Sequence, residues 1–192
     1  MIMLLPDDHT AGTDEYYPTP RAMVADNDLA LGQIVEAVSK SKFWKETAIF
    51  VVEDDSQAGL DHVDGRRTVS LCISPYTRRH HVESTMYNQN SILRTIELIF
   101  GLPPMNQFDL VATPMNDCFT DKPDFTPYTA LPNQIPLNEM NLKIGSLQGK
   151  QKHWAKESMK IPLDDVDMGD AKVFSRVLWY SVKGYSTRYP NK

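Results

Sequence analysis

The sequence predicts an α/β protein with a mostly parallel sheet and helices on its faces. Two observations lead to this prediction. The runs 47–52 and 69–73 are apolar at consecutive positions and rich in β-branched residues, which is typical of strands buried on both faces of a parallel sheet. The segments 21–39 and 89–100 instead repeat apolar residues every three or four positions, as amphipathic helices do. Strands that alternate with such helices indicate an α/β fold.

The first elements follow from local signals. Residues 1–5 are apolar and predict a short buried strand, an unusual start from which we expect the chain to begin within a domain. Thr19 and Pro20 then supply a capping hydroxyl and a proline at the first helical position. The polar loop 53–67 connects the two apolar runs, which we expect to be neighbouring strands of the sheet.

The second half of the chain is less regular. Asn88 is expected to cap the second helix and Gly101 to stop it. From 103 to 136 prolines recur with aromatic residues and no sustained period, which predicts an irregular arm. Two weak helices are expected at about 147–159 and 171–182.

Composition excludes several classes of protein. The 192 residues are 41% hydrophobic with a net charge of −5, which argues against a disordered chain and against a basic surface for nucleic acid. No apolar stretch approaches the roughly 20 residues of a membrane span. Residues 1–5 lack the basic flank of a signal peptide. The two cysteines, Cys72 and Cys118, have no metal-binding spacing, and Cys72 is expected to be a small buried apolar residue.

Acidic and imidazole side chains follow two of the predicted strands. Because ligands bind beyond the carboxyl ends of strands in such sheets, we expect these side chains to form one site. Carboxylates with imidazoles suit zinc, manganese or iron, and a two-metal site can hold a phosphate ester. The candidates are Asp7, Asp8, His9, Asp54, Asp55, Asp61, His62 and Asp64.

Each candidate has a structural alternative. Asp7 and Asp8 follow a proline, and a turn is at least as good an interpretation of that pair alone. Asp54 and Asp55 directly follow a buried strand, and adjacent carboxylates repel unless a cation lies between them, which favours a metal site.

The histidines are less specific. His62 could be a surface residue, and its case depends on Asp61 or Asp64 orienting the ring. His80 and His81 follow two arginines, where a solvated basic patch is the better interpretation.

Several of these stretches resemble a known family. Residues 5–12 are similar to the Pro, Asp, Gly-His signature of alkaline phosphatase superfamily phosphodiesterases. Residues 47–65 resemble the bacterial phosphoesterase and phospholipase C-like branch of that superfamily, where a strand ends in Asp-Asp or Asp-Glu and an Asp-His-Val follows a glycine. Three shorter segments also resemble that branch: 73–76, 91–97 and 101–104. The resemblance covers about residues 1–120.

The resemblance implies a three-layer α/β/α sandwich. Residues 1–120 would be the C-terminal half of a phosphoesterase domain, and 121–192 an irregular, partly helical extension packed on it. Members of this branch often follow a YncE-type β-propeller, so partners would be an N-terminal half, such a propeller or a second copy in a homo-oligomer. The resemblance also implies a periplasmic or secreted location.

For the site, the resemblance implies a hydrolase of phosphate mono- or diesters with two divalent ions, zinc or manganese. One ion would be held by Asp8 (or Asp7), His9 and His62, and the other by Asp54 and Asp55. Arg66 or Arg67 would contact the substrate phosphate.

Two departures from the family pattern bear on activity. The Ser or Thr nucleophile of the family is expected upstream of Met1, so we expect the isolated chain to be inactive. The family also commonly has a second histidine where this chain has Arg66. The alternative is a non-catalytic metal- or ligand-binding domain, or a subunit that requires a partner.

Overall fold

The computed structural model describes residues 1–5, 9–53, 68–163 and 168–190. These residues form two compact units. Of the described residues, those within 1–37 and 129–190 form what is called the terminal unit, and those within 38–53 and 68–128 form the central unit.

The terminal unit contains three helices within the described ranges. Helix α1 spans Pro20–Ser39, and the Thr19 hydroxyl accepts a hydrogen bond from the Ala22 amide at 3.3 Å, as the expected cap. After a short turn η3 (Ile144–Ser146), helices α4 (Gly149–Ser158) and α5 (Ala171–Lys183) pack against each other. These helices confirm the three predicted in this part of the sequence.

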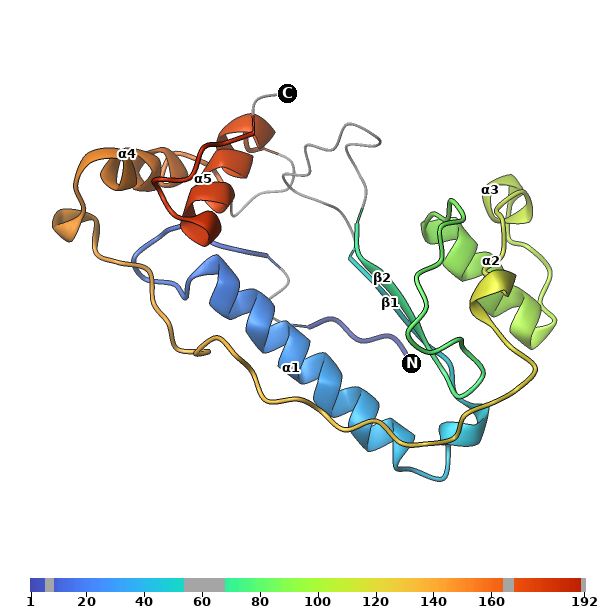
Figure 1. Ribbon diagram of the computed structural model, residues 1–192. Helices are drawn as coiled ribbons and strands as arrows, with labels where there is room; N and C mark the ends of the chain where they lie inside the picture. Colours follow the sequence, from blue (N-terminus) through green and yellow to red (C-terminus); the bar gives the residue numbers. More distant parts are fainter. Residues whose placement is uncertain (6–8, 54–67, 164–167, 191–192) are drawn as a thin grey trace. The chain divides into compact units, whose positions relative to one another are not determined.

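Residues 129–143, called the irregular segment, run along α1 in this unit (Figure 1). The Ala130 amide donates a hydrogen bond to Glu36 Oε2 at 2.8 Å. A Cβ atom built at Gly32 would lie 3.5 Å from the Ala130 Cβ, so the segment packs closely on the helix. Farther along, Pro18 and Met140 form an antiparallel bridge. The segment is therefore fixed by main-chain contacts although it has no regular structure of its own.

The central unit contains strands β1 (Ile49–Val52) and β2 (Ser70–Ile73), with helix α2 (Gln89–Phe100) following. Asn88 caps α2 in a capping box with Ser91, and Gly101 ends it in the left-handed conformation at φ 65°, as predicted. The remaining elements of this unit are short: η1 (Trp44–Glu46), α3 (Gln107–Leu110) and η2 (Asn116–Cys118).

The prediction of parallel neighbouring strands is wrong. β1 and β2 pair in antiparallel register from Ile49 opposite Ile73 to Val52 opposite Ser70 (Figure 1). Val52 and Leu71 are each 41% exposed, so the apolar runs are only half buried. A continuous apolar run indicates a capacity for burial on two faces, but it does not determine strand direction. The described residues form a mixed α/β structure with this one two-stranded sheet.

The prediction of a buried strand at residues 1–5 is also wrong. Met1 and Ile2 are fully exposed, and no β-pairing of residues 1–5 exists within the described ranges. A strand needs a neighbour to satisfy its amides and carbonyls, and apolar composition alone does not provide one.

Helix α2 buries different residues from those its periodicity indicates. Ser91, Thr95 and Glu97 are buried, whereas Leu98, Ile99 and Phe100 are 47%, 53% and 72% exposed. The last turn of α2 therefore presents apolar side chains to the surface. Among the described helices, none is both long and apolar enough to cross a membrane.

Candidate functional site

Most of the predicted site falls outside the described residues. Asp8, Asp54, Asp55 and His62, together with Arg66 and Arg67, belong to segments 6–8 and 54–67, and Asp7 does as well. His9 is described and is exposed. In the part of the chain that the structure describes, no three His, Cys, Asp or Glu side chains form a group that could hold a metal ion. Convergence of the predicted ligands therefore stays a prediction.

The flanks of segment 54–67 are joined by the β1–β2 ladder. Beyond the pair Val52 and Ser70, the Glu53 amide donates a hydrogen bond to the Val69 carbonyl at 3.2 Å. Glu53, which directly precedes this segment, and Val69, which lies just after it, are thus neighbours across an antiparallel pair. The predicted ligands in this interval therefore lie in sequence between β1 and its antiparallel partner β2.

The chain that follows His9 makes a tight turn against α4. Gly12 has φ 62°, and a Cβ atom built there would lie 2.3 Å from Ser158 Oγ, so glycine is required for both reasons. The Thr13 amide donates a hydrogen bond to the same Ser158 Oγ at 2.9 Å. Ser158 is only 2% exposed, so this hydrogen bond satisfies a buried amide.

Asn141, in the irregular segment, binds the loop between Gly12 and Pro18. Its side-chain amide lies within hydrogen-bond distance of four carbonyls, those of Gly12 at 3.3 Å, Asp14 at 2.9 Å, Tyr17 at 3.2 Å and Pro18 at 3.0 Å. Its own main-chain amide also donates to the Tyr17 carbonyl at 3.1 Å. One side chain therefore organises the carbonyls of a whole loop.

Glu139 fixes the junction between this loop and α1. Its carboxylate accepts hydrogen bonds from the Thr19 hydroxyl at 2.7 Å and from Arg21 Nε at 2.7 Å. The Thr19 amide donates to the Glu139 carbonyl at 2.8 Å. The hydrogen bonds from Arg21 and then Thr19 lower the pKa of the Glu139 carboxyl to about 2.

The residues from Thr10 to Arg21 are thus anchored by Glu139, Asn141 and Ser158. None of these three anchors was among the sequence candidates. Glu139 and Asn141 lie in a segment without periodicity and Ser158 at the end of a weakly predicted helix, so no local signal distinguishes them from other polar residues. Their importance depends on contacts across more than a hundred residues of sequence.

A cavity of about 580 Å³ adjoins these anchors within the terminal unit. Its walls include Thr13 from the loop, Asn141, Leu147 before α4 and Lys183 at the end of α5. Thr13 is 9% exposed, and its hydroxyl is buried without a hydrogen-bond partner among the described residues. The anchored loop therefore forms one wall of a hollow of mixed polar and apolar character.

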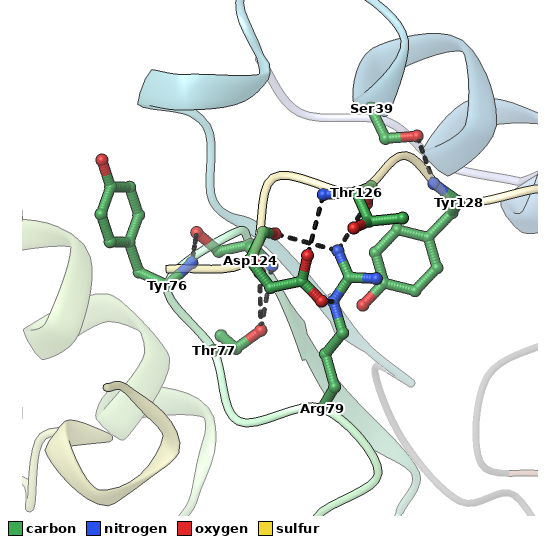
Figure 2. A network of polar contacts seen from close by, with 8 residues as sticks. Ser39, Tyr76, Thr77, Arg79, Asp124, Thr126 and Tyr128 are labelled. Carbon is green, nitrogen blue, oxygen red and sulfur yellow. Dashed lines mark hydrogen bonds and ion pairs between the residues drawn. The ribbon is translucent and has the colours of Figure 1, made fainter. Parts of the chain in front are cut away.

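In the central unit, Arg79 is the centre of a polar network (Figure 2). Its Nη2 donates to the carbonyls of Asp124 at 3.0 Å and Thr126 at 2.6 Å. Its Nε lies 3.2 Å from Asp124 Oδ2 as an ion pair, and its Cζ lies 4.4 Å from the centre of the Tyr128 ring. Hydrogen bonds from Thr126 to the carboxylate, together with the charge of Arg79, lower the pKa of Asp124.

This network corrects part of a prediction. His80 and His81 are exposed, as expected for a solvated basic patch, but Arg79 is not a free surface cation. Its donors are used to hold residues 124–128 of the irregular arm. Tyr128 is fixed further, because its amide donates to Ser39 Oγ at 2.9 Å (Figure 2). Arg79 therefore has a structural role in this arrangement.

Comparison with known proteins supports a phosphoesterase family. Residues 14–103 match the family model described as Phosphoesterase family. The match supports phosphoester hydrolysis as the type of activity and a phosphate ester as the type of substrate. No curated protein and no solved structure matches the chain. The matched range contains five of the predicted site residues, Asp54, Asp55, His62, Arg66 and Arg67, and does not contain Asp8 or His9.

Proposed function

We propose that the chain takes part in metal-dependent hydrolysis of phosphate mono- or diesters. The observation that supports this most directly is the phosphoesterase match over residues 14–103, which includes the acidic segment after β1. We further propose that the family belongs to the alkaline phosphatase superfamily, and that the protein acts in the periplasm or outside the cell.

The chemistry of the predicted donors fits two divalent ions. In the proposed arrangement Asp8, His9 and His62 hold one ion, and Asp54 and Asp55 hold the other. Carboxylate oxygens with imidazole nitrogens suit zinc or manganese. Ions bound there would polarise the phosphoryl oxygens and stabilise the charge that develops during hydrolysis.

The chain's own cationic and structural residues complete the proposal. Arg66 or Arg67 would orient the substrate phosphate, because a guanidinium can donate two parallel hydrogen bonds to its oxygens. On the described side, Asn141 and Ser158 fix the loop that follows His9, so they would limit the positions open to that ligand. The candidate set contains no hydroxyl nucleophile.

A specific observation favours a second candidate function, that of a subunit requiring a partner. Leu98, Ile99 and Phe100 are exposed at the end of α2, and Val52 and Leu71 are partly exposed on the sheet. Exposed clusters of large apolar residues mark interaction surfaces in soluble proteins. In this function the chain would bind metal or ligand without hydrolysing an ester by itself.

The test combines metal content with hydrolysis. The purified chain is loaded with zinc or manganese, its bound metal is measured by mass spectrometry, and turnover of p-nitrophenyl phosphate and bis-p-nitrophenyl phosphate is followed. D54A is the test variant, and D121A, which changes an exposed aspartate of the arm, is the matched control. Because no nucleophile is among the candidates, we expect little or no turnover from the isolated chain, so bound metal is the main measurement.

The outcomes separate the two functions. Metal retained by wild type and D121A but lost in D54A, with any turnover lost in parallel, supports the hydrolase. Metal that depends on Asp54 without turnover favours the partner-requiring subunit. Metal content that is unchanged in D54A would contradict the proposed site.

A further inference from the structure

The C-terminal helices are the basic part of an acidic chain. Residues 149–192 contain nine Lys or Arg against five Asp or Glu, whereas the whole chain has a net charge of −5. Three of these cations line one small cavity of about 200 Å³, formed by α4, α5 and the residues after α5. Three aromatic side chains complete the lining, which consists of Lys150, Trp154, Arg176, Tyr180, Arg188 and Tyr189. None of the described residues that line the cavity is acidic.

Aromatic rings, rather than carboxylates, hold two of these cations. Lys150 Nζ lies 3.8 Å from the centre of the Tyr180 ring, and Arg176 Cζ lies 5.3 Å from that of Tyr189. Such contacts are favourable, but they leave most of the N–H donors of the cations unused. Within the described ranges, Lys150, Arg176 and Arg188 have no ion pair and no side-chain hydrogen bond.

The aromatic wall is packed in place. Tyr180 is 6% exposed, and its ring lies 5.4 Å from that of Trp154 and 6.1 Å from the nearly parallel ring of Tyr185. The Tyr189 ring contacts that of Trp179 edge-on at 5.9 Å. The rings that position the cations are thus themselves fixed by neighbouring rings, so the arrangement is preorganised for a ligand.

Three like charges around a cavity of this size repel one another. Solvent ions screen such repulsion only over a Debye length, roughly 8 Å at physiological ionic strength, so charges that share one small cavity are screened only in part. An anion in the cavity would remove this repulsion and satisfy the unused donors. The arrangement has the features of an anion site: positive charge, free N–H groups and a rigid wall.

We propose that this cavity binds a phosphomonoester group. A phosphomonoester carries about −1.5 to −2 charges at neutral pH and three acceptor oxygens, which suits three cations better than a carboxylate with a single charge. The cavity is smaller than the roughly 300–1,000 Å³ of sites that enclose a whole small molecule, so the phosphate enters and the rest of the ligand lies outside, against Trp154 or Tyr189. The site uses none of the predicted metal ligands or substrate arginines.

The test is a titration of the ¹⁵N-labelled full chain with phenyl phosphate and inorganic phosphate, observing the indole N–H of Trp154. R176Q removes a lining cation, and K172Q removes another exposed cation of the same helix that is not among the residues lining the cavity. A charge-assisted hydrogen bond contributes about 1.5–3 kcal/mol, so we expect R176Q to weaken binding by about tenfold or more. K172Q should leave the affinity nearly unchanged, and benzoate should bind more weakly than phenyl phosphate.

Lipid vesicles identify the source of the phosphate. Vesicles of phosphatidylcholine with phosphatidic acid present a phosphomonoester, whereas phosphatidylglycerol at matched surface charge presents only a diester. If the chain sediments with the phosphatidic acid vesicles but not with the phosphatidylglycerol vesicles, the ligand is a lipid headgroup. If it binds phenyl phosphate but sediments with neither, the ligand is a soluble ester. The proposal is overturned if no phosphate produces a saturable shift at millimolar concentration. It is equally overturned if both lipids bind alike and R176Q and K172Q lose binding equally.

Discussion

Replacing Asn141 by alanine should loosen the loop that follows His9. The side-chain amide has two protons, so among its four carbonyl acceptors it can form about two good hydrogen bonds at a time, each contributing roughly 1 kcal/mol to stability. We therefore expect N141A to lower the free energy of unfolding by about 2 kcal/mol. N141D should cost more at neutral pH, because it would point a carboxylate at carbonyl oxygens.

Urea denaturation followed by circular dichroism measures the global effect. Amide hydrogen exchange at Thr13 and Thr19 measures the local one, since both amides are bonded within the anchored loop. N133A is the matched control, because Asn133 is exposed and its side-chain amide donates a single hydrogen bond, to the Ile135 carbonyl at 2.7 Å. Equal stability and equal exchange in N141A and N133A would refute the anchoring role.

Three further changes have defined outcomes. G12A combines a left-handed backbone with a Cβ 2.3 Å from Ser158 Oγ, so it should destabilise by about 2 kcal/mol or more in thermal denaturation, whereas G145A, with no atom within 4 Å of its Cβ, should not. V177A removes two methyl groups from a fully buried site in α5 and should cost about 2 kcal/mol in urea denaturation. The pKa of the Glu139 carboxyl is lowered to about 2 in the folded chain. Its ionised form therefore contributes to the free energy of unfolding above the ordinary pKa of 4.5, and this contribution is lost as the pH falls through 2. E139Q should therefore reduce the pH dependence of the free energy of unfolding between pH 5 and 2, the range set by that pKa shift. A pH dependence equal to that of the wild type would contradict this role of Glu139.

The helices could be predicted because their signals are local. Asn88 and Gly101 bound α2 as expected, since capping depends on residues within one turn of the helix end. The positions of β1 and β2 were also predicted, from apolar runs of the right length. Their antiparallel direction was not, because pairing depends on the path of the chain between them and not on the strands' own composition.

The candidate site likewise has a part that local motifs predict and a part that depends on distant contacts. Its predicted ligands were chosen from short motifs, and apart from His9 they lie outside the described residues. The anchors Asn141 and Ser158 could not be predicted, because a polar residue in an irregular segment has no periodicity to mark it and its partners lie more than a hundred positions away. Arg79 was misjudged for a similar reason, since its partners Asp124 and Thr126 lie 45 and 47 positions away in sequence.

The division of contacts between the two units has a consequence for synthesis on the ribosome. The central unit is complete once Tyr128 has been made, whereas the terminal unit joins Met1–Ala37 to Thr129–Lys192. The contacts at the start of α1 must therefore wait for Glu139, those of the loop before it for Asn141, and the turn at Gly12 for Ser158. The central unit can form first, as expected for nearby contacts, while the loop after His9 acquires its fixed shape only when the last third of the chain has emerged.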